Sequence, residues 1–368
     1  MSRMRVRARG EDIRRFILER VEKHPNDVSK MAAEHFKITR QAVNKHLRRL
    51  VYEKSITESG ETRKRTYKLA PLVEWKKSYT ITPELEEHVV WDKDISPTLG
   101  SQPENVNDIW RYGFTEMFNN AIDHSDGTMI SVKIVKTAVN TAMQITDNGI
   151  GIFNKIQQLL KLPDQRYSVL ELAKGKLTTD PDHHTGEGVF FTSRMFDKFS
   201  ILSDKVWFGH EFGDDEDWIL DASSDSGTGV FMELSNHTSR TEKKIFDQFA
   251  SSDDDYGFNK TVVPIKLAQY GNDKLISRSQ AKRVVARLDL FKTILFDFTD
   301  VPTIGQAFAD EIFRVFAKEH PNIEILPIRA NSEVKRMIDR VKSGRNFTLG
   351  DLFGKLATDT EEKEEKKE

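Results

Sequence analysis

Two polar residues spaced by four positions, Glu116 and Asn120, could together do chemistry. The stretch 106–123 has a helical pattern, and residues four apart on a helix share one face. A glutamate carboxylate can accept a proton, and an asparagine amide oxygen suits a hard cation such as Mg²⁺. The pair therefore predicts a site in which a base lies beside a metal ligand.

A second group follows a predicted strand. Asp147 ends the alternating apolar run 141–146, which is typical of a strand. A carboxylate in that place can accept a hydrogen bond from an exocyclic amine, such as that of adenine. Gly149 and Gly151 let the backbone turn sharply and approach a ligand without Cβ clashes. We therefore expect a ligand-facing turn directly after this strand.

Two further glycine motifs lie downstream. Gly186 and Gly188 precede the predicted helix 189–196, whose first amides could face phosphate oxygens. Thr228 then stands between two glycines at the start of the predicted strand 229–234. Alternatively, all these glycines are ordinary turns, and Glu116 and Asn120 are a surface pair.

The order Glu-x-x-x-Asn, Asp-x-Gly-x-Gly, Gly-x-Gly, Gly-Thr over roughly residues 100–236 resembles the ATP-binding domain shared by DNA gyrase, heat-shock chaperones, histidine kinases and MutL (GHKL). The resemblance implies an ATPase that uses ATP and Mg²⁺. It implies that Glu116 is the general base, Asn120 the Mg²⁺ ligand and Asp147 the adenine acceptor. By the same resemblance, Gly149 and Gly151 line the adenine pocket, Gly186 and Gly188 lie under the phosphates, and Thr228 supports the adenine side.

Length and composition set the broad class. A chain of 368 residues predicts two or three domains at roughly 100–200 residues each. It has no cysteine, which excludes disulfides and thiolate metal sites. It lacks an apolar run of about 18 residues and a signal-peptide pattern, so we expect a cytoplasmic protein without a membrane span.

Charge is divided unevenly along the chain. Residues 1–70 hold 19 Lys and Arg against 9 Asp and Glu, a net charge of +10, and the remaining residues sum to −12. A compact basic module on an acidic body indicates a polyanionic partner for that module alone.

The basic module has the pattern of a winged helix-turn-helix. The pattern predicts a helix over 11–24, a second helix capped by Asp27, and a third over 40–51 capped by Thr39. A two-stranded wing follows over 55–69. These elements resemble the DNA-binding domain of many bacterial repressors, although a winged helix can also serve protein contact.

Double-stranded DNA is the partner that this resemblance implies. On the third helix, Ala42, Val43, Leu47 and Leu50 would face inward, and the polar residues would face the bases. The wing cations would neutralise phosphates. The predicted DNA-binding residues are Arg40, Gln41, Asn44, Lys45 and Arg48 on the helix, with Arg63, Lys64 and Arg65 on the wing.

The central region is expected to fold as an α/β-sandwich. Residues 71–100 contain three prolines and predict a connector with one strand able to pack on the next domain, 101–240. Alternation predicts strands at 129–136, 140–146, 198–208 and 229–234, in a mixed sheet with helices on one face. In the ATPase family the segment 152–185 is the lid over the nucleotide, and here it ends in His183 and His184, for which a lid role is favoured over metal binding.

A third unit spans 260–342. Predicted strands at 261–267, 292–298 and 322–328 alternate with helices at 277–288, 304–318 and 332–341. Alternation of strands and helices predicts a small α/β domain with parallel pairing. The fold class is therefore α+β and multidomain, with a winged helix, a sandwich ATPase domain and a small α/β domain, followed by a disordered tail over 355–368.

The third unit resembles the STAS-like domains related to anti-anti-sigma factors. In that family a strand ends in an aspartate, here Asp297, and the next helix begins with a serine that a GHKL-type kinase phosphorylates. Here Gln306 stands at that helix start, and Thr303 is the nearby hydroxyl. The resemblance implies a protein partner at this domain. Alternatively, Asp297 and the pair Asp310 and Glu311 are purely structural.

These features leave three functions open. The leading interpretation is an ATP-binding regulator in which nucleotide switches a winged-helix DNA-binding module, with the STAS-like domain as docking partner. The alternatives are a serine/threonine kinase of the anti-sigma-factor type and a nucleotide-driven machine of the gyrase or MutL kind. The sequence leaves open whether ATP is hydrolysed, transferred or only bound, and whether the protein is a homodimer.

Overall fold

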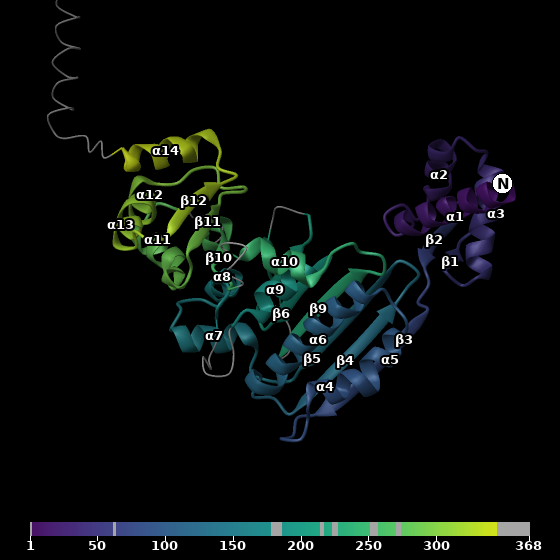
Figure 1. The fold of residues 1–368 in the computed structure, drawn as a ribbon, viewed down its shortest axis with the longest axis horizontal. Helices are drawn as coiled ribbons and strands as arrows, with labels where there is room; N and C mark the ends of the chain where they lie inside the picture. The colour runs from purple at the N-terminus through teal and green to yellow at the C-terminus, as the bar shows by residue number, and fades with distance from the viewer. Residues whose placement is uncertain are drawn as a thin grey trace, which may run out of the picture. The chain divides into compact units, whose positions relative to one another are not determined.

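The computed structural model describes residues 2–61, 64–177, 186–213, 217–222, 227–250, 257–269 and 274–343. The chain divides into two compact units, residues 1–248 and 249–368 (Figure 1). Within the described ranges, no helix is both long and apolar enough to cross a membrane.

Residues 2–69 form three helices and a hairpin with a hydrophobic core of their own. Ile17 and Val21, Val28 and Val43 are fully buried in this core, and Leu47 is nearly so. The two strands pair antiparallel, with Ile56 opposite Leu69. The elements are α1 Ser2–Arg20, α2 Val28–Phe36, α3 Arg40–Tyr52, β1 Ile56–Ser59 and β2 Thr66–Leu69.

The predicted N-terminal caps of α2 and α3 have different outcomes. Thr39 caps α3 as predicted, because its hydroxyl accepts a hydrogen bond from Ala42 N at 3.2 Å. The predicted cap at Asp27 is wrong: this side chain makes no capping bond to α2. Its carboxylate instead lies 3.2 Å from His24 Nδ1, and its backbone is not extended as a capping residue usually is.

The central part of the first unit is built on a seven-stranded sheet in the order β3-β4-β5-β9-β6-β7-β8. All neighbouring strands pair antiparallel, so the expected mixed sheet is wrong. Short turns join β4 to β5 and β6 to β7, and each returns the chain in the opposite direction. The strands are β3 Val73–Thr80, β4 Met129–Lys136, β5 Asn140–Asp147, β6 Lys198–Ser203, β7 Val206–Glu211, β8 Asp217–Asp221 and β9 Thr228–Ser235.

The structure defines two of the predicted strands of this sheet more closely than the sequence did. The strand expected within the connector is β3, which pairs along its whole length with β4 and so forms the edge of the sheet. The single strand expected over 198–208 is a hairpin of β6 and β7, which turns at Asp204 and Lys205. Asp204 has a φ of 50°, a conformation that aspartate tolerates better than most residues.

One face of the sheet is apolar and carries the helices. Val132, Ile145, Val230 and Ile201 face one another across four strands and are buried or nearly so. Helix α6, Glu104–His124, lies over β4, β5 and β9 (Figure 1) and buries its apolar stripe there. The other helices of this region are α4 Glu87–Val90, the π-helical turn η2 Trp91–Ile95, α5 Ser96–Leu99, α7 Ile152–Leu160, α8 Arg166–Lys174, α9 Gly188–Met195 and α10 Glu242–Phe249.

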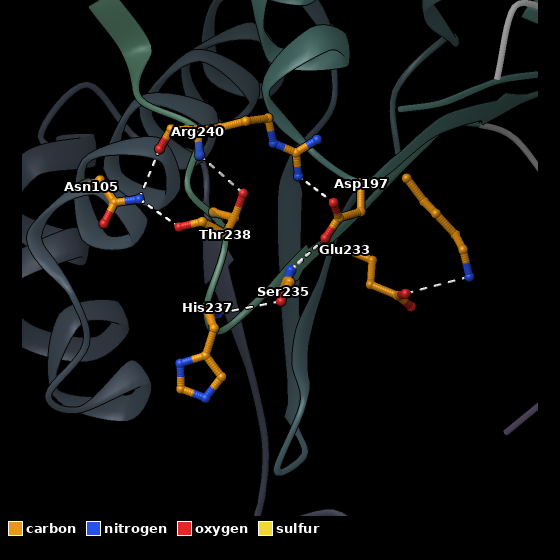
Figure 2. A network of polar contacts seen from close by, with 8 residues as sticks. Asn105, Asp197, Glu233, Ser235, His237, Thr238 and Arg240 are labelled. Carbon is orange, nitrogen blue, oxygen red and sulfur yellow. Dashed lines mark hydrogen bonds and ion pairs between the residues drawn. The ribbon is translucent and has the colours of Figure 1, made fainter. Parts of the chain in front are cut away.

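A polar network fixes the start of α6 to the end of β9 (Figure 2). Asn105 Nδ2 donates to the carbonyl oxygens of Thr238 and Arg240, each at 2.8 Å. The Arg240 guanidinium pairs with Asp197, which precedes β6 and also accepts a hydrogen bond from Ser235 N. Because α6 carries Glu116 and Asn120, the network and the packed apolar stripe of α6 together hold the helix that presents these two residues.

The second unit is a small α/β domain with a parallel sheet in the order β10-β11-β12, as predicted. Ile294 and Phe296 are buried, and the Phe296 ring packs edge-on against Phe313 at 5.9 Å. The Ser277 hydroxyl caps α11 and accepts from Gln280 N. The elements are β10 Lys260–Pro264, η3 Ile265–Ala268, α11 Arg278–Val285, η4 Leu288–Leu290, β11 Thr293–Asp297, α12 Gln306–Asp310, η5 Glu311–Phe316, α13 Ala317–Glu319, β12 Glu324–Ile328 and α14 Ser332–Lys342.

Candidate functional site

A cavity of about 270 Å³ lies in the first unit between α6, α7, α9 and the sheet. It brings together residues from four separate stretches of the sequence. The predicted site residues that line it are Glu116, Asn120, Asp147, Gly186, Gly188 and Thr228. Gly149 and Gly151 lie instead in the turn that leads from Asp147 to α7.

Helix α6 contributes Glu116 and Asn120 to one wall. Both side chains are half-buried and lie one turn apart. No hydrogen bond joins the Asn120 amide to another described residue, so its donors and acceptor are available to a ligand in the cavity. The Glu116 carboxylate lies against Gly188, the first residue of α9. A Cβ at position 188 would lie 1.9 Å from Glu116 Oε2, so any other residue there would require the Glu116 carboxylate to move.

Asp147 forms the floor of the cavity at the end of β5. Its side chain is 7 % exposed, and Oδ1 accepts hydrogen bonds from Gly149 N at 2.8 Å and Thr228 N at 3.2 Å. Burial raises the pKa of this carboxyl, and the hydrogen bonds from Gly149 and Thr228 partly oppose that shift. The Thr228 hydroxyl in turn accepts from Ile152 N at 3.0 Å and fixes the start of α7.

The turn after Asp147 needs two glycines for different reasons. A Cβ on Gly149 would lie 2.0 Å from the Ser125 carbonyl oxygen, which is a steric clash. Gly151 has a φ of +86°, which L side chains rarely adopt. Both glycines therefore shape the backbone of this turn, and neither is among the residues that line the cavity.

The segment after this turn contains two helices, α7 and α8, and the backbone then approaches itself closely at Leu177 and Gly186. Leu177 N donates to Gly186 O at 3.2 Å, and both residues line the cavity. A Cβ on Gly186 would lie about 2.5 Å from the Leu177 backbone. His183 and His184, expected at the end of the lid, lie outside the described residues. In the ranges that the structure does describe, no three His, Cys, Asp or Glu residues cluster as a metal site would require.

Residues on α7 and at the end of α6 also line the cavity, although the sequence pattern did not single them out. Ile152, Lys155 and Ile156 line the cavity from α7, and His124 lines it from α6. The spacing 152, 155, 156 is that of one helix face, so the helical pattern after Gly151 was the signal that could have found them. Lys155 Nζ donates to His124 O at 2.8 Å and to Asp126 Oδ2 at 2.9 Å.

The predicted DNA-facing residues of α3 all lie on its exposed side, whereas Val43, Leu47 and Leu50 are buried and Ala42 is half-buried. In the hairpin, Lys64 is exposed, and Arg65 is partly exposed beside Glu58, with 3.5 Å between Nη1 and Oε2. Arg63 lies outside the described residues. The exposed residues of α3 are Arg40, Gln41, Asn44, Lys45 and Arg48.

In the second unit, Asp297 is a buried carboxylate whose hydrogen bonds go to neighbouring side chains. It is 4 % exposed at the end of β11. The Arg329 guanidinium donates two hydrogen bonds to its carboxylate, from Nε to Oδ1 at 2.9 Å and from Nη2 to Oδ2. Thr299 also donates to Oδ1 through its hydroxyl. Thr303 is exposed in the loop that follows, and Gln306 is the first residue of α12.

Comparison with known proteins supports one part of the chain. Residues 280–335 match the model of a family described as a STAS-like domain of unknown function (DUF4325). The C-terminal unit therefore contains a STAS-like domain, in the place that the sequence resemblance indicated. No curated protein matches the chain.

Proposed function

We propose that this chain is an ATP-binding regulator in which nucleotide in the cavity of the first unit switches a winged-helix DNA-binding module. The observation that carries the proposal is the convergence of Glu116, Asn120, Asp147, Gly188 and Thr228 on one cavity. These residues come from four motifs in the order that GHKL ATP-binding domains have. Unrelated turns and surface pairs would have no reason to meet in this way.

The residues around the cavity fit ATP. Asp147 is a buried acceptor suited to the adenine amine, and the first residues of α9 at Gly188 present backbone amides to an anion. Asn120 would hold Mg²⁺, together with phosphate oxygens and water, because Mg²⁺ commonly takes few protein ligands beside a nucleotide. Bound Mg²⁺ would neutralise charge on the phosphates. Glu116 would accept the proton of the attacking water or hydroxyl.

DNA binding is proposed for the N-terminal module. Its net charge of +10 over residues 1–70 and the exposed polar side of α3 support contact with a polyanion. Side chains of α3, among them Asn44 and Arg48, would reach base edges, and the hairpin cations would contact phosphates.

The STAS-like domain supports a second candidate, a serine/threonine kinase of the anti-sigma-factor type. The exposed hydroxyl of Thr303 beside the start of α12 is the observation that favours it. Gln306 at the helix start, where that family has serine, favours docking over phosphate transfer. We therefore place the regulator first, with the STAS-like domain as the contact for a protein partner.

One experiment separates these functions. The purified full-length chain is incubated with Mg²⁺ and ATP labelled at the γ-phosphate, with and without duplex DNA. Label in free phosphate indicates hydrolysis, label on the chain indicates autophosphorylation, which mass spectrometry would locate at Thr303 or elsewhere, and retained ATP indicates binding alone. The regulator predicts that DNA changes nucleotide affinity, by the same factor as ATP changes DNA affinity. Nucleotide affinity that is identical with and without DNA would refute the switch.

A further inference from the structure

Carboxylates outnumber ammonium groups among the described residues that line the cavity. Glu116 and Asp147 place two carboxylates on its walls, and His124 and Lys155 are the basic side chains among the described residues that line it. Lys155 is the one ammonium or guanidinium group in that set. A nucleotide adds further negative charge beside these two carboxylates, and a lysine ammonium would neutralise part of it in addition to the proposed Mg²⁺.

Lys155 is one of the residues that line the cavity, and neighbours at the end of α6 hold its ammonium. Its side chain is 25 % exposed, and Nζ donates to the His124 carbonyl oxygen and to Asp126 Oδ2. An ammonium has three N–H donors, so one remains for a ligand. The His124 carbonyl is at the C-terminal end of α6, and this bond fixes the direction of the lysine side chain.

The bond to Asp126 is the replaceable one. The Asp126 side chain is 57 % exposed, and ion pairs of exposed carboxylates contribute little because water solvates both partners. An anion bound inside the cavity would be less solvated than the Asp126 carboxylate. It would therefore compete well with Asp126 for the Lys155 ammonium. The first residues of α7 and α9, Ile152 and Gly188, also line the cavity, and their helix N-termini favour negative charge there.

We propose that Lys155 binds a phosphate group of the nucleotide and thereby makes the cavity prefer nucleotides to nucleosides. This inference rests on the proposed function, since it assigns a further binding residue to the same site. Lys155 would then exchange its bond to Asp126 for a charge-assisted bond to phosphate, while the bond to His124 O keeps it in place.

The test compares ATP with adenosine on the full-length chain. Affinities are measured by isothermal titration calorimetry for wild type, Lys155→Met and Lys155→Arg. Lys155→Met should weaken ATP about ten-fold or more, the effect of losing one charge-assisted hydrogen bond, and should leave adenosine within about two-fold. Lys155→Arg keeps the charge and should recover most of the ATP affinity. Lys133→Met is the matched control, because Lys133 pairs with Glu74 on the sheet and does not line the cavity.

The outcomes distinguish the inference from the function on which it rests. A wild-type chain that binds neither ATP nor adenosine refutes both. ATP affinity that is unchanged in Lys155→Met, with wild type binding ATP normally, refutes the inference alone. Equal loss of ATP and adenosine, with a lower melting temperature, also refutes it, because Lys155 would then only support the end of α6. Selective loss of ATP with recovery in Lys155→Arg supports it.

Discussion

Replacing Asp147 by asparagine separates ligand binding from folding at one buried carboxylate. In the wild type, Oδ1 accepts hydrogen bonds from Gly149 N and Thr228 N. An asparagine oxygen can accept both bonds, so the floor of the cavity should keep its shape. The amide nitrogen then takes the place of the second oxygen and presents donors to the adenine amine, which is itself a donor. The variant should therefore lose ATP without losing its fold.

The magnitude follows from the type of bond removed. Hydrogen bonds to charged groups contribute roughly 1.5–3 kcal/mol, which corresponds to about a ten- to 150-fold loss of affinity. The repulsion between two facing donors adds to this loss, so we expect Asp147→Asn to abolish measurable ATP binding. Asp92→Asn is the matched control, because it makes the same chemical change at an exposed carboxylate that does not line the cavity.

Although Asp147→Asn should lose ATP affinity, it should not lose stability at neutral pH. Burial raises the pKa of Asp147, so its ionised form is disfavoured in the folded chain. A raised carboxyl pKa contributes stability below the unfolded pKa and loses it as the pH rises through the folded pKa. At neutral pH the melting temperature of Asp147→Asn should thus equal or exceed that of wild type, and the difference should shrink on acidification.

Calorimetric titration with ATP at neutral pH, and thermal unfolding followed from neutral to acidic pH, check both expectations. Wild-type ATP affinity in Asp147→Asn would show that this carboxylate does not bind the nucleotide. A folded variant with lower melting temperature at neutral pH would show instead that the charge stabilises the floor of the cavity.

Three further expectations concern the same chain. Glu116→Ala should bind ATP but lose turnover in a phosphate-release assay, and wild-type hydrolysis in this variant would remove Glu116 as the base. Gly188→Ala should weaken nucleotide binding, measured by titration, because the added Cβ displaces the Glu116 carboxylate; unchanged affinity would mean that the Glu116 side chain can move aside without loss of binding. In gel-shift assays over a salt series, Lys64→Ala with Arg65→Ala should weaken binding to every duplex and flatten the salt dependence, whereas Arg48→Ala should alter sequence preference. Failure of the wild-type chain to retain any DNA at low salt would favour a protein-docking winged helix.

Much of the local structure could be predicted from pattern alone. Helix α3 followed from Thr39 and the apolar spacing of Val43, Leu47 and Leu50, because capping and periodicity act within a few residues. The strand at 129–136 has the predicted bounds, since one buried face makes its alternation strict. Asp27 failed as a cap because a neighbouring histidine engages its carboxylate, a contact that no propensity encodes.

The candidate site divides in the same way. Residue types and motif order singled out Glu116, Asn120 and Asp147 from the sequence, because the chemistry of a side chain does not depend on its neighbours. Lys155 was missed because a lysine on a mixed helix is usually solvent-exposed, and only the end of α6 at His124 explains its direction. Likewise, Gly149 and Gly151 were expected to line the pocket, but they lie in the turn after Asp147, where close contact with Ser125 and a positive φ call for glycine.

The sequence by itself determined the kinds of element, the separation of a basic N-terminal module from an acidic body, and the parallel α/β character of the STAS-like unit. These properties arise from charge, periodicity and the alternation of strands with helices, all of which are local in the chain. Only the tertiary structure decided that the central sheet is antiparallel throughout, that β3 is its edge, and that residues from four distant motifs enclose one cavity. Strand order and cavity shape depend on which buried faces pack together, and that choice is made by side chains far apart in the sequence.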